Sequence, residues 1–406
     1  MKKLLGILAF LFCGVVSAQP CTQTLNPPGA DIAAAILNAG VGTVICLNSG
    51  TYPYIEINAN KSGPVILRST TGTEAVIADM LVWRSRNIVF RSLTIGGFRI
   101  DDFEGSPNTR NIYIIGNVLT GLNVFDMAGN SDANIVLYGN TIGGYDKPVD
   151  GNEGTLQFTN NGSDPTGPAG IRVEHNLFEG GHCADGVQNS GQTGITIGPG
   201  NIFRNWITPC NDVHVDAIQL QGGSINVTGN YFENNSVHIG YYDGGDNCVI
   251  TNNIFNGGGV DSGGSSHQAF QIGGINGMLF AHNTIRNIAT SGIGTKIANS
   301  PNINWVIENN VLVNSTIQPG GDQPGCGANC IVRFNLLDAS STLITGGTNT
   351  DNTVGTASFA GGSNPATNFQ GWRLNSGSPG QSAANDGKDV GSNFFNAAAL
   401  GIFQNR

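Results

Sequence analysis

An asparagine recurs at one place in a repeated strand pattern, and this feature constrains the fold more than any other. From residue 87 onward, an apolar segment is followed by Asn, any residue and a large apolar residue. Repeats of this length indicate a solenoid, in which each repeat is one coil stacked on the next. A buried turn at the same place in every coil needs partners for its backbone groups, and a stacked Asn supplies both a donor and an acceptor. The nine copies, 23 to 36 residues apart, are Asn117, Asn140, Asn176, Asn201, Asn230, Asn253, Asn283, Asn310 and Asn335.

Glutamines recur in a second pattern, in short and largely apolar segments. Gln157, Gln188 and Gln219 are 31 residues apart, and Gln271 follows 52 residues later. Alternation of apolar and polar residues predicts strands with one buried face. We therefore expect a sheet of parallel strands, one per coil, whose outward face carries amides and ionisable groups.

Composition and charge agree with such a fold. The chain has 60 glycines and only 11 % charged residues, which favours many short strands joined by tight turns. The formal net charge is −10, and no basic patch is evident, so nucleic acid is not an expected partner. An acidic, weakly charged surface is compatible with a secreted protein that binds sugars or cations.

The N-terminal residues predict a signal peptide, residues 1–18. Lys2 and Lys3 form its positive segment, the apolar run 4–16 follows, and the small residues up to Ala18 fit a cleavage site. The apolar run is too short to span a bilayer comfortably, and no later segment is long and apolar enough for a membrane span. The chain is therefore expected to be secreted or periplasmic, soluble and monomeric. Residues 31–38 predict a short amphipathic helix that covers the open end of the solenoid.

Seven cysteines follow the predicted leader, and an exported chain permits disulfides. No spacing among them resembles a zinc site. Cys248 lies in an apolar strand and is expected to be a buried thiol. By proximity along the coil path, the plausible pairs are Cys21–Cys46, Cys183–Cys210 and Cys326–Cys330.

The repeat, over residues 44–337, resembles the right-handed parallel β-helix proteins of the pectate-lyase-like kind. Segments 369–374 and 376–379 also resemble the terminal segment of secreted β-helix enzymes. The resemblance implies an all-β, right-handed parallel β-helix of about ten coils with a short N-terminal capping helix. This fold carries polysaccharide lyases, glycoside hydrolases, epimerases, esterases and adhesins, so function must be argued from the site. The expected divisions are residues 1–18 for the signal peptide, 19–43 for an N-terminal cap, 44–339 for the β-helix and 340–406 for a C-terminal cap segment.

The candidate site is the outward face of the glutamine strands. Neighbours two residues apart face the same way, and adjacent coils lie about 4.8 Å apart. The residues expected at the glutamine position are Asp101, Asp126, Gln157, Gln188, Gln219, Gly240, Gln271 and Gly294. Two residues earlier we expect Arg99, Thr155, Ala217 and His238, and two residues later Thr159, Gln221, Tyr242 and Lys296. One patch would then contain His238, Gln219, Gln221, Tyr242, Gln271 and Lys296.

Two aspartates, Asp185 and Asp216, come before successive glutamine strands and are predicted to lie in register, each near a histidine, His182 or His214. Stacked carboxylates repel each other unless one is protonated or a cation lies between them. This makes Asp185 and Asp216 candidate ligands of Ca²⁺. The alternative is that both cap turns through backbone amides, just as a glutamine ladder can satisfy its own hydrogen bonds.

Motifs of several β-helix enzymes are absent. The set Asn-x-Asp, Asp-Asp, Gly-His-Gly and Arg-x-Lys of polygalacturonase-type hydrolases does not occur, nor does the Asp-Pro-His of mannuronan epimerases. Lyases of this fold that use Lys with calcium would suggest Lys in the strand before a Gly-Gly turn, where this chain has Gln271. Lys296, one coil later, is a candidate replacement.

The leading hypothesis is a polysaccharide lyase that cleaves a uronate-containing polymer by β-elimination. This reaction needs a base, a group that neutralises the uronate carboxylate, and an acid for the leaving oxygen. Candidates are His238 or Lys296 as base, Tyr242 as acid, and Arg99 or a cation held by the two aspartates as neutralising group, with His214 and Asp216 beside them. The glutamines Gln157, Gln188, Gln219, Gln221 and Gln271 would hold sugar hydroxyls. The alternatives are a glycoside hydrolase with Asp185 and Asp216 as its paired carboxylates, and a non-catalytic carbohydrate-binding or adhesive solenoid.

Overall fold

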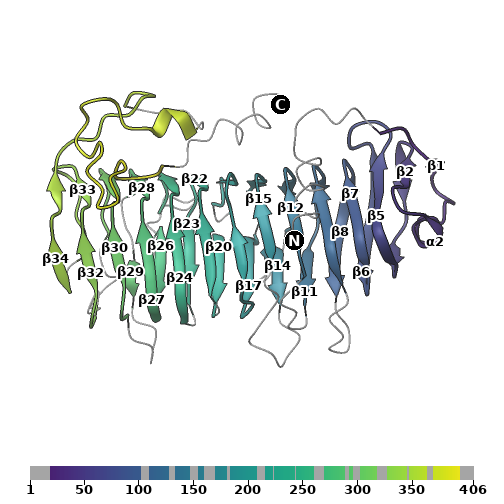
Figure 1. Ribbon diagram of the computed structural model, residues 1–406, viewed down its shortest axis with the longest axis horizontal. Helices are drawn as coiled ribbons and strands as arrows, with labels where there is room; N and C mark the ends of the chain where they lie inside the picture. Colours follow the sequence, from purple (N-terminus) through teal and green to yellow (C-terminus); the bar gives the residue numbers. More distant parts are fainter. Residues whose placement is uncertain are drawn as a thin grey trace.

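Parallel strands follow one another along the chain and stack into an elongated solenoid (Figure 1). The fold is an all-β, right-handed parallel β-helix, as predicted. The computed structural model describes residues 19–101, 109–127, 133–146, 154–159, 170–180, 183–207, 215–222, 224–242, 244–259, 269–288, 292–295, 302–317, 327–344, 347–363 and 369–393.

Three sheets run the length of the solenoid, with the long strands β6 and β8 shared by the second and third. Sheet 1 contains β1 (Gln23–Leu25), β2 (Val44–Leu47), β5 (Asn60–Ser69), β7 (Arg86–Arg91), β9 (Arg110–Ile115), β12 (Ile135–Tyr138), β15 (Ile171–Glu174), β18 (Ile195–Ile197), β21 (Ile225–Thr228), β24 (Gly245–Thr251), β27 (Ile275–Ala281), β30 (Val306–Glu308), β32 (Ile331–Arg333) and β34 (Thr348–Thr350). Sheet 2 contains β4 (Ile55–Ile57), β6 (Ala75–Trp83), β8 (Thr94–Asp101), β11 (Asn123–Asp126), β14 (Gly154–Thr159), β17 (Asp185–Ser190), β20 (Asp216–Gln221), β23 (Val237–Tyr241), β26 (Phe270–Gly273) and β29 (Gly292–Thr295). Sheet 3 adds β3 (Gly50–Tyr52), β10 (Val118–Leu119), β13 (Thr141–Gly143), β16 (Leu177–Glu179), β19 (Ile202–Arg204), β22 (Tyr231–Glu233), β25 (Ile254–Asn256), β28 (Thr284–Arg286), β31 (Val311–Val313), β33 (Leu336–Leu337) and β35 (Thr353–Val354).

The strands of sheet 1 indicate more coils than the asparagine repeat predicts. Twelve of its strands, β2 to β32, lie within residues 44–339, against about ten expected coils. The difference arises because the earliest coils, before Asn117, are built without the repeated asparagine. The sheet also extends into both flanking segments, through β1 and β34.

The predicted helix is present as α2 (Ile32–Asn38). Asp31 is its N-cap and accepts a hydrogen bond from the Ala34 backbone N–H at 2.8 Å. Ile32 and Ile36 are buried against β4 and β5. Figure 1 places this helix at one end of the solenoid, where it covers the first coils. No helix in the described part of the chain is long and apolar enough to cross a membrane.

The core is built from the same position in successive coils. Phe178, Phe203, Phe232 and Phe255 stack with ring centroids 4.4, 4.9 and 4.7 Å apart. These four rings come from β16, β19, β22 and β25, which are neighbours in sheet 3. Because the strands pair in register, an apolar residue in one coil lies directly over its counterpart in the next.

The nine repeated asparagines form one buried ladder, which confirms the prediction. Each is at most 1 % exposed. The Asn230 side-chain amide donates to Asn253 Oδ1 at 3.0 Å and to Ile197 O at 2.9 Å, and Asn253 Oδ1 also accepts from the Asn230 backbone N–H. Asn352 continues the ladder beyond Asn335, at a position that the repeat did not predict.

Replacing Asn230 by alanine is expected to lower the free energy of unfolding by about 1–3 kcal/mol, because it leaves buried backbone groups without partners. Chemical denaturation measures the change. Asn226→Ala, on the exposed side of β21, is the matched control and should have little effect. Equal stability of the Asn230 variant and the wild type would show that the ladder does not stabilise the fold.

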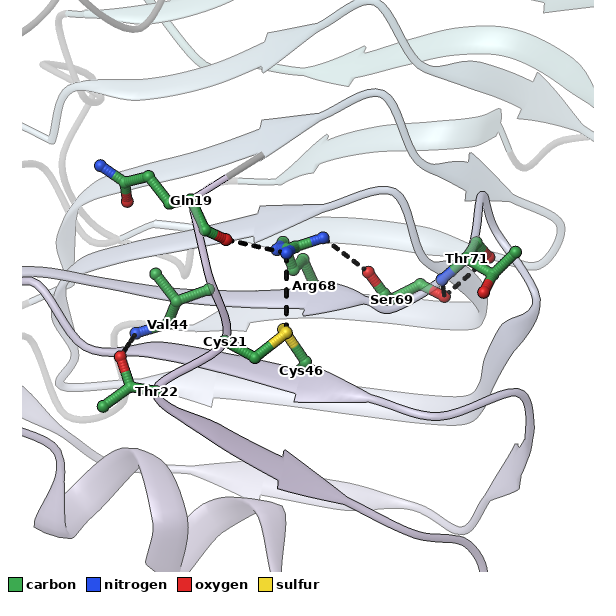
Figure 2. Close-up of a disulfide and its surroundings, with 8 residues drawn as sticks. All are labelled: Gln19, Cys21, Thr22, Val44, Cys46, Arg68, Ser69 and Thr71. Carbon is green, nitrogen blue, oxygen red and sulfur yellow. Dashed lines mark hydrogen bonds between the residues drawn. A yellow bond between two sulfur atoms is a disulfide. The ribbon is translucent and has the colours of Figure 1, made fainter. Parts of the chain in front are cut away.

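One predicted disulfide, Cys21–Cys46, is present with an S–S distance of 2.00 Å. Figure 2 shows Arg68 beside it, donating to Gln19 O at 2.9 Å. Cys183 and Cys330 are also disulfide-bonded, while their predicted partners at positions 210 and 326 lie outside the described residues. Cys248 is a buried free thiol, as expected. A disulfide at the start of the solenoid agrees with an oxidising compartment.

The C-terminal segment 369–393 runs back along the solenoid and packs on the outer side of sheet 3. Its residues Phe369, Trp372 and Val390 form an apolar cluster with Tyr231 and Leu336 of that sheet. It begins with the short 3₁₀ helix η2 (Phe369–Trp372). The outer side of sheet 3 is therefore covered here.

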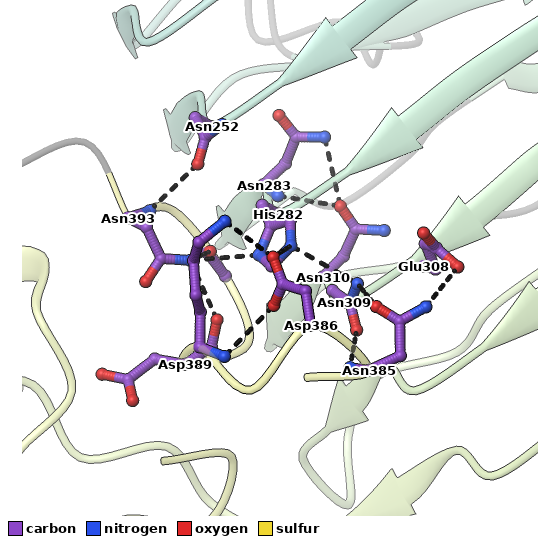
Figure 3. A network of polar contacts seen from close by, with 12 residues as sticks. Asn252, His282, Asn283, Glu308, Asn309, Asn310, Asn385, Asp386, Asp389 and Asn393 are labelled. Atoms are coloured by element: carbon purple, nitrogen blue, oxygen red, sulfur yellow. Dashed lines mark hydrogen bonds and ion pairs between the residues drawn. The ribbon is translucent and has the colours of Figure 1, made fainter. Parts of the chain in front are cut away.

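Polar contacts fix the same segment (Figure 3). The His282 ring lies 3.4 Å from an Asp386 carboxylate oxygen and 3.0 Å from the Asn393 side-chain nitrogen. The Asn385 amide donates to Glu308 Oε2 at 3.0 Å. These contacts hold the segment against the turns between sheets 1 and 3.

Candidate active site

The outward face of sheet 2 carries two rows of side chains, each running from coil to coil. The first, which we call the glutamine row, contains Glu56, Leu81, Arg99, Val124, Gln157, Gln188, Gln219, Gly240, Gln271 and Gly292. The second row, two residues further along each strand, contains Trp83, Asp101, Asp126, Thr159, Ser190 and Gln221.

The predicted alignment of Gln157, Gln188, Gln219, Gly240 and Gln271 is confirmed. The predicted positions of Arg99, Asp101 and Asp126 are wrong by two residues: Arg99 lies in the glutamine row and the two aspartates lie in the second row. Side chains on a strand alternate with period two, so a shift of two residues leaves the face unchanged but moves each group along the strand.

The predicted place of Gly294 in the glutamine row is also wrong. Gly292 occupies that position, next to Gln271. The register shifts between Ile272 and Gly273, and this irregularity has no counterpart in the glutamine spacing.

The glutamine side chains bond to one another. Gln157 Nε2 donates to Gln188 Oε1 at 3.1 Å, and Gln188 Nε2 donates to Gln219 Oε1 at 3.5 Å. Gln188 and Gln219 are only 7 % and 4 % exposed. The alternative that the ladder satisfies its own hydrogen bonds is therefore confirmed, and the row presents fixed amides rather than mobile ones.

Asp185 and Asp216 lie next to each other and are buried, 1 % and 0 % exposed. The Asp216 backbone N–H donates to Asp185 Oδ1 at 2.8 Å, which fits the predicted pairing of successive coils. Burial, and then the neighbouring Asp216 charge, raises the pKa of Asp185 well above its usual range. Asp185 Oδ2 has no hydrogen-bond partner among the described residues. The raised pKa favours the protonated form of Asp185.

Tyr242, directly after β23, connects this pair to the glutamine row. Its hydroxyl donates to Gln271 Oε1 at 3.0 Å and also interacts with the Asp216 carboxyl group. Burial, and then the Asp216 charge, raises the pKa of Tyr242, so its hydroxyl stays protonated and can act as a proton donor.

Gly240 makes this arrangement possible. A Cβ atom there would lie 2.5 Å from Tyr242 Cε2 and 2.7 Å from its hydroxyl oxygen, and it would collide with Asp216 Oδ2. Only glycine allows the ring and the carboxyl group to approach so closely. Asp185, Asp216, Gly240, Tyr242 and Gln271 are called the acidic cluster below.

The prediction that His238 lies open on the outward face is wrong. The side chain is fully buried, and its ring packs 5.4 to 5.8 Å from the rings of Phe232, Phe255 and Phe270. Its Nε2 lies 2.6 Å from Gly257 O, and its Nδ1 lies 3.1 Å from the Asn235 amide nitrogen. Burial lowers the pKa of His238 to about 4. Because a carbonyl accepts, Nε2 carries the proton and Nδ1 accepts from Asn235, so no lone pair is left for a substrate proton.

His182, His214 and Lys296 lie outside the described residues, and their predicted roles stay predictions. Gln221 lies in the second row, where it is partly exposed.

Arg99 is 49 % exposed and forms ion pairs with Asp101 at 2.6 Å and Asp126 at 3.6 Å. Burial raises the pKa of Asp101, whereas the nearby Arg99 lowers it. Five strand-to-strand steps separate β8 from β23, which directly precedes Tyr242, or roughly 24 Å. Arg99 and Tyr242 therefore cannot act on the same sugar unit.

The predicted calcium site needs more oxygen ligands than the described side chains supply. Ca²⁺ takes roughly six to eight oxygen ligands. The described residues contain no group of three carboxylate, histidine or cysteine side chains that could hold a metal. One oxygen of Asp185 already accepts the Asp216 N–H. The described part of the cluster does not fit the ion.

Comparison with known proteins gives a match in structure only. No protein-family model and no curated protein sequence matches the chain. A mutant of the PL6 family alginate lyase AlyGC superimposes with a TM-score of 0.51 at 15 % identity, covering 92 % of this chain and 58 % of the other. The alginate lyase AlyF-OU02 gives a TM-score of 0.43 at 12 % identity, covering 93 % of this chain and 95 % of the other. This chain thus spans less than two thirds of the AlyGC chain. At such identity, the likeness to AlyGC supports the parallel β-helix fold.

Proposed function

We propose that this protein is a polysaccharide-degrading enzyme, a lyase that cleaves a uronate-containing glycan by β-elimination. The observation that carries the proposal is the acidic cluster: a proton donor, Tyr242, held beside a buried carboxyl pair at sheet 2. Rows of polar side chains that repeat every 4.8 Å or so suit a polymer lying across several coils. The structurally similar AlyGC is an alginate lyase, and alginate is a polyuronate.

In this reaction Tyr242 gives its proton to the leaving glycosidic oxygen. Without substrate that hydroxyl donates to Gln271 Oε1 at 3.0 Å, so its hydrogen turns from Gln271 to the glycosidic oxygen when the glycan binds. The partly exposed side chains of Gln157 and Gln221, on the same face, hold sugar hydroxyls. A pair of aspartates that shares one proton carries one negative charge rather than two, which reduces its repulsion of a uronate carboxylate.

The base that removes the proton next to the uronate carboxylate is assigned to Lys296 or His214. Of the other candidates named from the sequence, His238 is buried with both ring nitrogens hydrogen-bonded, and Arg99 is remote from Tyr242.

Hydrolysis is the second candidate function, and a specific observation favours it. The five residues of the acidic cluster include no basic side chain, but they do include paired carboxyl groups, of which Asp185 has a raised pKa. Glycoside hydrolases use such a pair, one group protonated as the acid and the other ionised.

The leader of residues 1–18 and the Cys21–Cys46 disulfide support a secreted or periplasmic protein, cleaved after about Ala18. The proposed partner is a polysaccharide, and the proposed state is a monomer.

The test is a screen of polyuronates, galactans and neutral glycans. A lyase produces a C=C bond conjugated with the uronate carboxylate, which absorbs ultraviolet light. New reducing ends without that absorbance would identify a hydrolase instead. If neither signal appears with any polymer while a glycan still binds, the protein is a non-catalytic carbohydrate-binding solenoid.

A further inference from the structure

The outward face of sheet 2 continues beyond the glutamines toward the N-terminus, and its character changes there. Glu56 and Arg99 occupy the glutamine row on β4 and β8, and Trp83 occupies the second row on β6. Tyr54, next to β4, is 55 % exposed and is one of the few large hydrophobic side chains so exposed in the described chain. Two aromatic side chains thus accompany charged groups on the same open face.

Neighbouring groups hold these side chains in place. Trp83 Nε1 donates to Glu56 Oε1 at 2.8 Å, and the Arg84 guanidinium lies 5.0 Å from the centre of the Trp83 rings. Arg99 is held by Asp101 at 2.6 Å. Tyr54 stands two residues before Glu56, so its side chain leaves the chain on the same face as that of Glu56. Little side-chain entropy is left to lose on binding, which favours affinity.

The chemistry of these groups fits a sugar ring. Aromatic side chains offer apolar area together with a polar group at one edge, and a sugar has apolar C–H faces and hydroxyl edges. Carboxylate and guanidinium groups form strong hydrogen bonds with hydroxyls. Because Arg99 is already paired with Asp101, and Glu56 adds a negative charge, the surface suits hydroxyl groups better than a carboxylate.

We propose that Tyr54, Glu56, Trp83 and Arg99 form a distal sugar-binding subsite, which binds the same glycan chain that the acidic cluster acts on. The inference rests on the proposed function. Its physical basis is continuity: β8, β11, β14, β17, β20 and β23 are successive neighbours, so one unbroken face joins Arg99 to Gly240. Five steps between these strands span roughly 24 Å. Only an oligosaccharide long enough to cover that distance contacts both places.

The test measures binding by calorimetry for a length series of oligosaccharides made from the polymer that the screen identifies. Trp83→Ala and Tyr54→Ala are each expected to weaken the binding of long oligosaccharides by about tenfold. The binding of oligosaccharides too short to span the face should not change. Leu37→Ala is the matched control, since Leu37 is 58 % exposed but lies on α2, away from sheet 2.

The outcomes separate the two proposals. If the wild type neither binds nor cleaves any of the glycans, the proposed function and the subsite both fail. If the wild type binds long oligosaccharides and the Tyr54 and Trp83 variants bind them equally well, the subsite is wrong while the function stands. Trp83→Phe keeps an aromatic ring but loses the hydrogen bond to Glu56. If the Trp83→Ala variant does not fold, Trp83→Phe replaces it in the binding measurement.

Discussion

Replacing Tyr242 by phenylalanine is expected to lower the turnover number by about 10²–10⁴-fold, the usual contribution of a positioned proton donor. The variant removes one oxygen atom and keeps the ring that packs over Gly240. Gln271 Oε1 loses the hydrogen bond from the Tyr242 hydroxyl, but Gln271 is partly exposed and can be hydrated. The measurement is steady-state kinetics on the polymer identified by the screen, together with a denaturation curve that checks the fold.

Tyr241→Phe is the matched control for this result. Tyr241 precedes Tyr242 in the chain but is fully buried in the core, where its hydroxyl donates to Gly222 O at 3.1 Å. The Tyr241→Phe substitution should lower the free energy of unfolding and leave the turnover number unchanged. A Tyr242 variant that folds and turns over at the wild-type rate would remove Tyr242 from the mechanism and leave the acid to be sought elsewhere.

Replacing Asp185 by asparagine is expected to flatten the dependence of stability on pH. The pKa of Asp185 is raised in the folded protein, so the folded state holds this proton more tightly than the unfolded state does. Its stabilising contribution is complete below about pH 4, the ordinary pKa of an aspartate, and is lost as the pH rises toward the folded pKa. Each pKa unit of the shift corresponds to about 1.4 kcal/mol.

The asparagine keeps an oxygen that can accept the Asp216 N–H, and it carries no charge at any pH. Above about pH 4 the variant should therefore become progressively more stable relative to the wild type. Urea denaturation over a range of pH measures the difference between the two curves. Asp246→Asn, on the exposed part of β24, is the control and should follow the wild type. Parallel curves for the Asp185 variant and the wild type would mean that the pair holds no proton.

The sequence alone determined the fold and the sheet that carries the candidate site. A parallel β-helix repeats one local structure, so each coil needs the same residues at the same places, and that need is visible as spacing. The asparagine ladder was predictable for this reason, because every buried turn requires the same hydrogen bonds. The alignment of Gln157, Gln188 and Gln219 was predictable because two equal intervals leave one register.

Irregular coils were not predictable in the same way. The intervals from Arg99 to Val124 and from Val124 to Gln157 are unequal, 25 and 33 residues, which misplaced Arg99 and Asp101 along the strands. Gly294 was misplaced because it lies at the register shift that follows the pairing of Gln271 with Gly292. The N-terminal end of the face was missed because its polar and aromatic residues, such as Glu56 and Trp83, do not repeat. The alternation of Ile55, Glu56 and Ile57 was the signal that could have indicated it.

Only the tertiary structure decided how far each polar side chain is buried and which form of it, charged or neutral, is favoured. Alternation along a strand assigns a face but says nothing of what lies over that face, and covering groups come from distant parts of the chain. His238 has the outward position of its strand, yet aromatic rings from three other strands enclose it. Asp185 and Asp216 are acidic residues that sequence alone cannot distinguish from exposed turn caps. Burial raises the pKa of Asp185, because removing a charge from water costs more free energy than protonating it.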